Sequence, residues 1–186
     1  MKRAFDLILS VSAMAVLLIP ALIIALLVRL TSDGPVLYWS ERVGLNNRIF
    51  RMPKFRTMKI DTPVMATHLM QNPDIFITSI GRFLRKSSLD EIPQLCSIVK
   101  GDMSFVGPRP ALFNQYDLIE LRTKKGIHKL MPGLTGLAQI NGRDELPIPI
   151  KVEYDEYYKN NMSFLFDLKI LFGTFLKVLK NEGVTH

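Results

Sequence analysis

The sequence predicts a helix-rich α/β domain whose N-terminal helix is embedded in a membrane. Three observations lead to this fold class. The chain has 186 residues, 48% of them apolar, which suffices for one domain with a buried core. Residues 7–28 carry no charge, and residues 161–180 repeat apolar side chains at helical spacing. Between these segments, strand-like and loop-rich stretches alternate with shorter helical ones.

The composition excludes two classes of site. Cys96 is the single cysteine, so neither an internal disulfide nor a cysteine cluster for zinc can form. His68, His128 and His186 do not have the spacing of a metal site. Both observations are typical of a reducing compartment. The formal net charge of +7 indicates anionic partners, which range from nucleic acid to phosphorylated small molecules or a lipid surface.

The first predicted element is a membrane helix over residues 7–28. As a straight helix this stretch would be about 33 Å long, which matches the apolar core of a bilayer. Its length and the lack of a small-residue cleavage site disfavour a secretory signal. Pro20 lies near its middle, where a proline removes one backbone donor and frees the carbonyl of Val16. Ser12 is the nearby polar side chain that can approach this carbonyl.

Charge on both flanks predicts how this helix sits in the membrane. Lys2 and Arg3 precede it, and a basic cluster over 29–59 follows it. Because basic flanks favour the cytoplasmic side, both ends are expected there. A helix bent at Pro20 that enters and leaves through one leaflet satisfies this condition, and we expect residues 1–30 to form such a re-entrant hairpin. A tilted spanning helix with a tolerated kink is the alternative.

Residues 31–186 are expected to form the remaining domain, which begins with a β-hairpin. The hairpin is predicted over 36–58, with its turn at 44–47. Its mixture of aromatic and basic side chains suits a lipid headgroup region, and it suits equally a half-buried sheet with a solvated cationic face. Helical segments follow at 75–86, 90–100 and 111–127, and loops dominate from 101 to 110.

Residues 161–180 predict an amphipathic helix. Lys169, Lys177 and Lys180 occupy polar positions. This pattern is typical of a helix that lies in a membrane interface, and packing against a core explains the same pattern equally well. The apolar face consists of Leu165, Leu168, Phe172, Phe175, Leu176 and Leu179.

The adjacent carboxylates of Asp90 and Glu91 are the main candidates for catalysis. They follow Arg85 and Lys86, and Ser88 with Glu91 matches a capping box at a helix start. A carboxylate there stays ionised, because it meets the positive end of the helix dipole. One carboxylate can then act as a nucleophile while its neighbour holds a hard cation. Ordinary helix capping explains the same residues.

Two loop motifs are candidates for binding phosphate. In the first, Gly107 and Pro108 precede Arg109, whose planar guanidinium is presented from a stiff loop beside backbone amides. The second, residues 132–143, contains three glycines and Thr135 but lacks both the dinucleotide-binding and the Walker spacing. Loop geometry alone explains each motif as well.

Together these features fit phosphoryl transfer at a membrane. The reaction requires in-line positioning, a divalent cation on phosphate oxygens, and arginine or lysine side chains that neutralise charge. The carboxylate pair and the basic residues supply these parts. The membrane helix implies that one substrate is a lipid.

Five motifs occur together and in order: KFRTM (54–58), SSLDE (87–91), GDMSFVGPRP (101–110), PGLTGLAQINGR (132–143) and SFLFDLKI (163–170). With these motifs the whole chain resembles the small monotopic phosphoglycosyl transferases of the bacterial sugar transferase family. The resemblance implies a membrane enzyme that moves a phospho-sugar from a UDP-sugar to a polyprenyl phosphate such as undecaprenyl phosphate and releases UMP. Such an enzyme starts the assembly of a glycoconjugate.

The resemblance also implies roles for individual residues. Asp90 is expected to form a covalent phospho-sugar intermediate, and Glu91, with Asp90, to hold Mg²⁺. Arg109 is expected on the nucleotide side, and Pro20 is expected to break the re-entrant helix. Further substrate contacts are expected from Lys54, Arg56, Arg85, Gly107, Pro108 and Thr135. The catalytic domain, residues 31–186, is then expected on the cytoplasmic face of the bacterial inner membrane.

The sequence departs from the family pattern at one position. Many members have a serine before the helix-breaking proline, whereas this chain has Ile19, so that hydroxyl cannot satisfy the freed backbone. Small members end where this chain ends, so no further domain is expected. Similarity to the small forms favours an N-acetylated amino sugar, with glucose and galactose left open. The oligomeric state is also open, with a homodimer as one candidate.

Two other classes of protein remain as alternatives. A membrane-tethered nucleic-acid binder would use the +7 charge and the basic cluster, but it has no use for a carboxylate pair. A lipid-surface scaffold would tolerate the loss of Asp90. The carboxylate pair favours the enzyme, and no nucleic-acid partner is expected.

Overall fold

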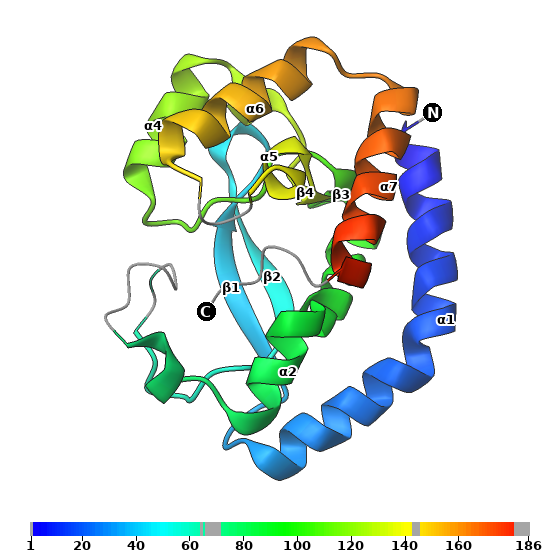
Figure 1. The fold of residues 1–186 in the computed structure, drawn as a ribbon, viewed down its shortest axis with the longest axis vertical. Helices are drawn as coiled ribbons and strands as arrows, with labels where there is room; N and C mark the ends of the chain where they lie inside the picture. Colours follow the sequence, from blue (N-terminus) through cyan, green and yellow to red (C-terminus); the bar gives the residue numbers. More distant parts are fainter. Residues whose placement is uncertain (1, 64, 66–71, 143–145, 181–186) are drawn as a thin grey trace.

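Helices dominate the molecule, and two small sheets lie among them (Figure 1). The computed structural model describes residues 2–63, 65, 72–142 and 146–180, without the side chains of Pro73, Leu179 and Lys180. This order of elements confirms the helix-rich α/β class. The elements are α1 (Lys2–Thr31), β1 (Leu37–Val43), η1 (Leu45–Asn47), β2 (Ile49–Phe55), η3 (Pro73–Ile75), α2 (Ser79–Ser87), η4 (Leu89–Gln94), α3 (Leu95–Lys100), β3 (Ser104–Val106), α4 (Tyr116–Lys124), η5 (Ile127–Lys129), β4 (Gly133–Thr135), α5 (Leu137–Ile140), α6 (Ile148–Asn160) and α7 (Phe164–Lys180).

The strands β1 and β2 confirm the predicted hairpin. They pair antiparallel along their whole lengths, and the chain turns at residues 44–47. Arg51 lies over the ring of Trp39 and Arg56 over the ring of Tyr38, at 5.8 and 5.9 Å from the ring centroids. Cation–π contacts therefore organise the interleaved basic and aromatic side chains of this hairpin.

Two loop motifs that are far apart in the sequence meet in a short parallel sheet. The strands β3 and β4 align Ser104 with Gly133 and Val106 with Thr135. Just after β3, the amide of Gly107 donates to the carbonyl of Thr135 over 2.9 Å. A Cβ atom on Gly133 would lie 2.2 Å from the nitrogen of Gly107, so this approach requires glycine. The glycines of both motifs thus let the two backbones interlock.

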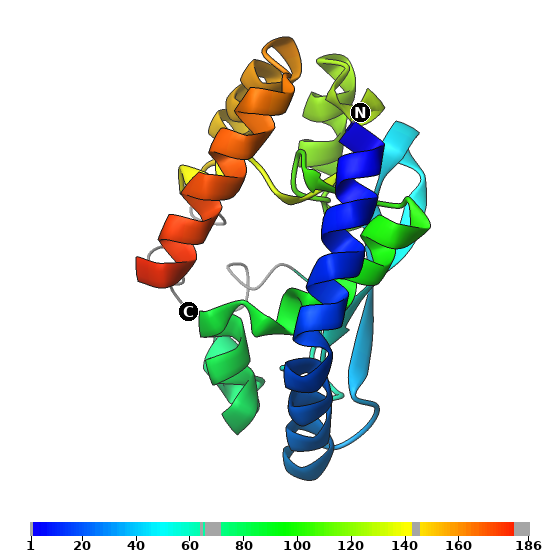
Figure 2. The ribbon, with the colours of Figure 1, turned by 90° about the vertical axis from the view of Figure 1, so that its right-hand side faces the viewer.

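The helix α1 is long, apolar and bent. It has 30 residues, and its most apolar stretch has a mean hydropathy of 2.9 with 11% of that stretch buried. It is the helix in the described part of the chain that is long and apolar enough to cross a bilayer. Figures 1 and 2 show a bend part of the way along it, and Pro20 is the proline inside it.

Both arms of α1 pack on the same body. In the N-terminal arm, the carboxylate of Asp6 accepts a hydrogen bond of 3.1 Å from the amide of Phe105 in β3. In the C-terminal arm, Ile24 and Val28 are buried in a cluster with side chains of β2 and α2. A helix whose two arms lie on either side of a proline therefore contacts one domain at both ends.

The charged start of α1 is bound to the domain. Lys2 pairs with the carboxylate of Asp167 in α7 and donates to the carbonyl of Val106 over 3.0 Å. Arg3 donates to two carbonyls at the end of α3, where its charge complements the negative end of the helix dipole. Both side chains that the sequence assigns to the basic flank thus also hold the helix to β3, α3 and α7.

A central apolar cluster fixes β3 against the helices. Tyr158 of α6 is buried in it, and its hydroxyl donates to Asp167 over 2.7 Å. The same carboxylate pairs with Lys2, so the cluster carries the attachment point of α1. Its members are Met52, Leu95, Ile98, Met103, Phe105, Val106, Tyr158 and Ile170.

Three predicted helices differ in extent. The segment predicted over 90–100 is divided into the 3₁₀ helix η4 and α3, which begins at residue 95, and the other two begin later than predicted. The helix predicted over 111–127 is α4, which begins at residue 116, because the Leu112 amide bonds to the Gln115 side chain at 2.9 Å in a turn before it. The helix predicted from residue 75 is α2, which begins at 79, because the Thr78 hydroxyl caps it by accepting from the Gly81 amide.

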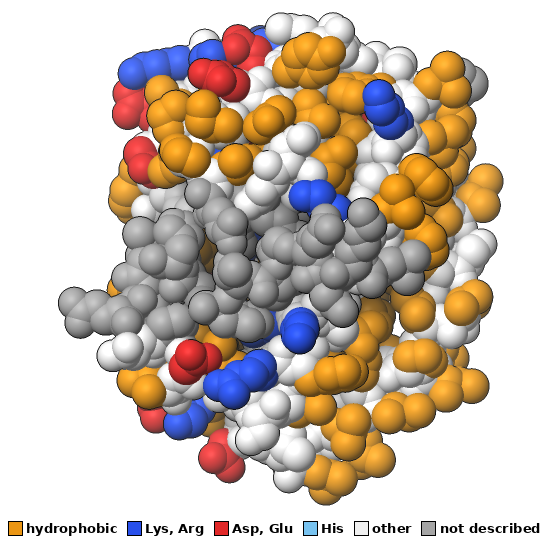
Figure 3. Space-filling model, in the orientation of Figure 1, with side chains coloured by type: hydrophobic (Ala, Val, Ile, Leu, Met, Phe, Trp, Pro, Cys, Tyr) orange, Lys and Arg blue, Asp and Glu red, His pale blue; other side chains and the backbone are white. Residues whose placement is uncertain are grey.

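The helix α7 confirms the predicted C-terminal helix and turns its apolar stripe outward. Leu165 and Phe172 of the predicted face are 77% and 63% exposed, while the buried Ile170 lies on another face. Packing against this domain therefore does not explain the stripe. Figure 3 shows apolar side chains gathered along the side of the molecule where α1 and α7 lie. The side chain of Leu179 lies outside the described set.

The interlocked glycines yield a first prediction. Gly133→Ala should destabilise the fold by about 2 kcal/mol or more, because the new methyl group meets backbone rather than a movable side chain. For a chain of this size, thermal unfolding should shift down by roughly 4–8 °C. Gly173→Ala is the control, because the nearest atom there is a side-chain carbon of Ile140 at 3.4 Å. Equal melting temperatures for the two variants in detergent would contradict this account.

Candidate functional site

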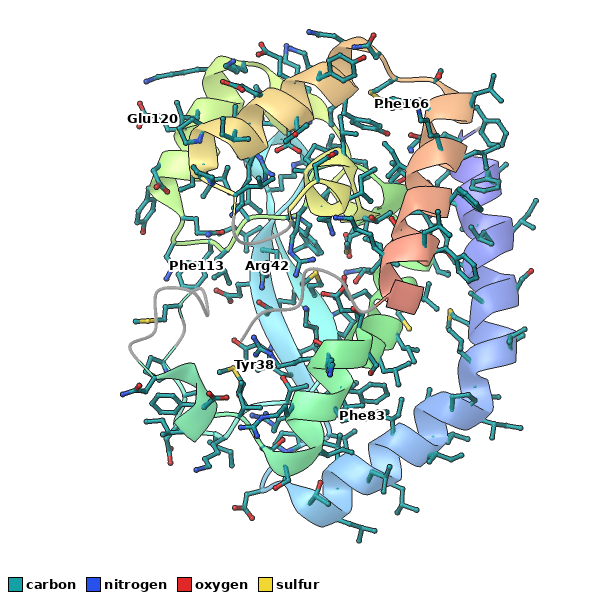
Figure 4. The ribbon with its side chains drawn as sticks, in the orientation of Figure 1. Tyr38, Arg42, Phe83, Phe113, Glu120 and Phe166 are labelled. Carbon is teal, nitrogen blue, oxygen red and sulfur yellow. The ribbon has the colours of Figure 1, made fainter. Side chains whose placement is uncertain are left out.

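A cleft of about 880 Å³ opens beside the β1–β2 hairpin. Its other walls come from η4, from the loops after β3 and β4, and from α1, α5 and α7. Figure 4 shows Tyr38 and Arg42 on β1, and both side chains line the cleft. The structure therefore brings most of the predicted site residues together around one space. Those that line it are Lys54, Arg56, Arg85, Asp90, Glu91, Arg109 and Thr135.

The 3₁₀ helix η4 places both carboxylates on the wall of the cleft. Ser88 ends α2 in a left-handed conformation, with φ of 57°, and turns the chain into η4. Its hydroxyl makes no capping bond, so the predicted capping box is wrong. A box requires an extended residue at this position, whereas the left-handed backbone directs the side chain elsewhere. The Glu91 amide instead donates to the carbonyl of Ser88 over 3.2 Å.

Two cations hold the carboxylate of Glu91. The Lys54 ammonium of β2 lies 2.7 Å from Glu91 Oε1 and 3.6 Å from Asp90 Oδ2. The Arg109 guanidinium lies 3.3 Å from the same Glu91 oxygen. The Glu91 side chain is 19% exposed and Asp90 is 8% exposed, so these pairs are only weakly screened by solvent.

The two neighbouring carboxylates differ in how readily they ionise. Burial, reinforced by the charge of Glu91, raises the pKa of Asp90 against the opposing effects of Lys54, Arg85 and Arg109. Burial also opposes ionisation of Glu91, but the charges and hydrogen bonds of Lys54 and Arg109 together outweigh it and hold the pKa of Glu91 well below its usual range. Both carboxylates are poorly solvated, but Glu91 is a fixed anion whereas burial disfavours ionisation of Asp90, contrary to the expectation that a carboxylate at this position stays ionised.

The loop that carries Arg109 is held by its carbonyl groups. The prolines on either side of Arg109 have no N–H, so they donate no backbone hydrogen bond. Four successive carbonyls instead accept bonds from other elements, and these fix the backbone from which Arg109 reaches Glu91. The Gly133 amide donates to Pro108 (2.9 Å), the Arg122 guanidinium to Arg109 (2.7 Å), the Arg42 guanidinium to Pro110 (3.2 Å), and the Val43 amide to Ala111 (2.9 Å).

A buried ion pair behind this loop was not predicted from the sequence. Arg122 of α4 bonds to Asp155 of α6 at 2.7 and 2.9 Å, and its side chain is 11% exposed. Burial raises the pKa of Asp155, although Arg122 opposes the shift. One sequence signal was present: Asp155 shares a helical face with the buried Val152 and Tyr158. The pair positions Arg109 through its carbonyl.

The remaining predicted residues are engaged within the protein. The Gly107 amide donates to Thr135, so it is not the anion donor that the sequence suggested, and neither Gly107 nor Pro108 lines the cleft. The Thr135 hydroxyl lies 2.7 Å from that of Thr174 in α7. Arg56 donates to the carbonyl of Pro35 over 2.8 Å while lining the cleft. Residue 143, at the end of the second loop motif, lies outside the described residues.

The carboxylate pair suits a hard cation that is shared with substrate. Within residues 2–63, 65, 72–142 and 146–180, no three His, Cys, Asp or Glu side chains form a complete protein cage. Magnesium rarely requires such a cage, since one or two carboxylates with water and substrate phosphates suffice. The ionised Glu91 and the adjacent Asp90 are oxygen donors of this kind.

Comparison with known proteins identifies the family of this chain. Residues 1–181 match the family model described as bacterial sugar transferase. The uncharacterized sugar transferase EpsL of Bacillus subtilis is 41% identical over 99% of this chain and 90% of its own length.

Two longer relatives carry substrate names. The UDP-glucose:undecaprenyl-phosphate glucose-1-phosphate transferase of Escherichia coli K12 is 41% identical over 98% of this chain and 41% of its own length. The UDP-N-acetylgalactosamine-undecaprenyl-phosphate N-acetylgalactosaminephosphotransferase of Aeromonas hydrophila is 36% identical over 98% of this chain and 44% of its own length. This chain therefore spans less than half the length of these two proteins. The match over nearly all of its own length shows that it belongs to the bacterial sugar transferase family.

Proposed function

We propose that this protein transfers a sugar 1-phosphate from a UDP-sugar to undecaprenyl phosphate, releases UMP, and works through a covalent intermediate on Asp90. The observation that carries the proposal is the buried Asp90–Glu91 pair in a cationic cleft. The family match and the substrates named for the relatives support the reaction class. Neither a lipid-surface scaffold nor a nucleic-acid-binding protein would require two buried carboxylates.

The mechanism has two displacements at one phosphorus atom. A carboxylate oxygen of Asp90 attacks the sugar-linked phosphorus, a new P–O bond forms, and the bond to UMP breaks. A phosphate oxygen of the lipid then attacks the same phosphorus and releases Asp90. Because the Asp90 side chain is only 11% exposed, little water has to leave before its ionised form attacks. Lys54, Arg85 and Arg109 stabilise the charge on the phosphoryl oxygens.

Magnesium is part of the proposal. Glu91, with Asp90, would hold it, and bound Mg²⁺ would supply positive charge beside the phosphate oxygens. Arg109 is proposed to contact the nucleotide side, since its guanidinium fork suits phosphate and its backbone is fixed.

The proposed membrane arrangement places α1 as a re-entrant helix in the cytoplasmic membrane, with the site on the cytoplasmic face. Both arms of α1 contact one domain, which a straight spanning helix does not allow. The outward apolar face of α7 is proposed to lie in the same interface. In this arrangement the cleft lies at the level of the membrane surface at which the phosphate of the lipid is found.

The sugar is left to experiment. The relatives named above act on glucose in one case and on N-acetylgalactosamine in the other. We retain an N-acetylated amino sugar as the proposed donor, and a panel of UDP-sugars in a UMP-release assay identifies it. The product lipid is proposed to enter glycoconjugate or polysaccharide assembly.

Asp90→Asn should abolish the reaction. The amide is no nucleophile, so turnover should fall by at least about a thousandfold. Mass spectrometry of the wild type incubated with UDP-sugar alone should show protein carrying one phospho-sugar, and the variant should show none. Asp74→Asn is the matched control, because that carboxylate is 61% exposed and pairs with Arg82. A phospho-sugar adduct on the Asp90→Asn variant would end the proposal.

Glu91→Gln should weaken the response to magnesium. The substitution keeps the shape of the side chain but removes the charge, so the midpoint of the Mg²⁺ titration should rise roughly tenfold. Glu120→Gln on α4 is the control, since Glu120 is exposed and lies away from the cleft. If both variants titrate like the wild type, Glu91 has no role at the metal.

Both ends of α1 should face the cytoplasm. Single cysteines at the exposed positions Ala4 and Glu41, in a background with the exposed Cys96 replaced by serine, should be protected equally from a membrane-impermeant thiol reagent in intact cells. Pro20→Leu restores the helical hydrogen bond and should favour a straight span that exposes residue 4 outside. Labelling of residue 4 from outside in the parent protein would rule out the hairpin.

A further inference from the structure

The helices α1 and α7 meet at one end and diverge from it. The rings of Phe5 and Phe164 lie edge to face with their centroids 5.2 Å apart. Figure 2 shows the two helices separating steadily away from this contact. The backbones of the two helices are therefore farther apart at the C-terminal end of α7 than beside the Lys2–Asp167 attachment.

The cleft reaches the opening between these two helices. Its lining includes the carboxylates of Asp90 and Glu91 and continues through Ile92, Leu95 and Phe105. Its lining also includes apolar side chains of both helices: Ala13, Leu17 and Leu171 pack partly against the central cluster, whereas Phe175 and Val178 are exposed. The helix residues on the lining are Ala13 and Leu17 of α1 with Leu171, Phe175 and Val178 of α7, beside Thr174 and Lys177.

The part of the cleft between the carboxylates and the two helices changes from cationic to apolar. The inner end has Lys54, Arg85 and Arg109 around the carboxylates, which suits a phosphate group. The outer end is mainly apolar, which suits a hydrocarbon chain. A ligand that matches both ends has an anionic head and a long apolar tail.

The outer surfaces of both helices indicate what surrounds the opening. Val16 of α1 is 76% exposed and Leu165 of α7 is 77% exposed. Apolar side chains of this exposure are stable when they contact lipid rather than water. With lipid around both helices, a hydrocarbon chain passes from the bilayer into the opening without crossing water.

The cleft also has polar lining that belongs to neither α1 nor α7. This part consists of Arg42 of β1, Gln115 before α4 and Lys151 of α6. A nucleotide bound at these side chains and a lipid tail between the helices would not compete for the same space. Both would present phosphate to the same carboxylates.

From these observations we infer that the acceptor lipid enters sideways, with its polyisoprenoid tail lying between α1 and α7 and its phosphate at the carboxylate pair. The inference rests on the proposed function and adds the path of the lipid tail to it. Leu17 and Phe175 are the side chains on opposite walls that would contact the tail.

Leu17→Trp tests the path by narrowing the opening. The KM for undecaprenyl phosphate should rise about tenfold or more, because the larger ring occupies space that the tail needs. The amount of phospho-sugar bound to protein after incubation with UDP-sugar alone should be unchanged. Leu18→Trp is the matched control, because Leu18 is 58% exposed on the same helix and does not line the cleft. It should leave both measurements unchanged.

A second variant and a second substrate distinguish a narrowed lipid path from a variant that is simply misfolded. Phe175→Ala removes an exposed side chain and should also raise the KM for the long lipid. A two-isoprene phosphate, which is too short to reach the helices, should react equally with all variants. An unchanged KM for the lipid in both variants would overturn the inference. Equal losses with the long and the short acceptor would overturn it too, because they would show that the opening holds an ordinary membrane lipid or that the substitutions damage the enzyme in general. Failure of the wild type to release UMP from any UDP-sugar would instead overturn the proposed function.

Discussion

The site depends on keeping two adjacent carboxylates inside a cleft. Burying a charge is costly unless opposite charge and hydrogen bonds compensate it. Lys54 and Arg109 provide that compensation at one oxygen of Glu91, whereas at Asp90 the effect of burial exceeds that of the neighbouring cations. The rest of the fold supports these two cations. A strand presents Lys54, and a loop with four bonded carbonyls presents Arg109.

The strand β3 joins the membrane helix to the site. Asp6 and Lys2 bond to the backbone of Phe105 and Val106, directly before the loop that carries Arg109. The close pairing of Gly107 with Gly133 and Thr135 then ties this loop to β4 and, through the Thr135–Thr174 contact, to α7. The helices α1 and α7 and the loop that carries Arg109 are therefore all attached to one small sheet, which links the apolar helix α1 to the cleft.

Membership of the sugar transferase family and the geometry lead to one account of function. The cleft is lined by cationic side chains, among them Lys54 of the hairpin, by apolar side chains of α1 and α7, and by the two carboxylates. An enzyme that moves a phospho-sugar from a water-soluble sugar nucleotide to a membrane lipid needs access from both phases. One cleft with both kinds of lining suits that requirement, and the proposed covalent intermediate removes the need for both substrates to be bound at the same time.

The sequence by itself determined the local elements: the apolar run with Pro20, the hairpin over 36–58, the C-terminal amphipathic helix and the Asp90–Glu91 pair. Each depends on neighbouring residues, on periodicity or on a proline, so composition and spacing suffice to predict it. Only the tertiary structure decided which partners the polar groups take. Ser88 does not cap, Gly107 bonds to Thr135, and Arg122 with Asp155 supports Arg109, because those contacts join segments that are distant in the chain. The outward direction of the α7 stripe was decided in the same way, since a period of 3.6 residues defines a face but not what it contacts.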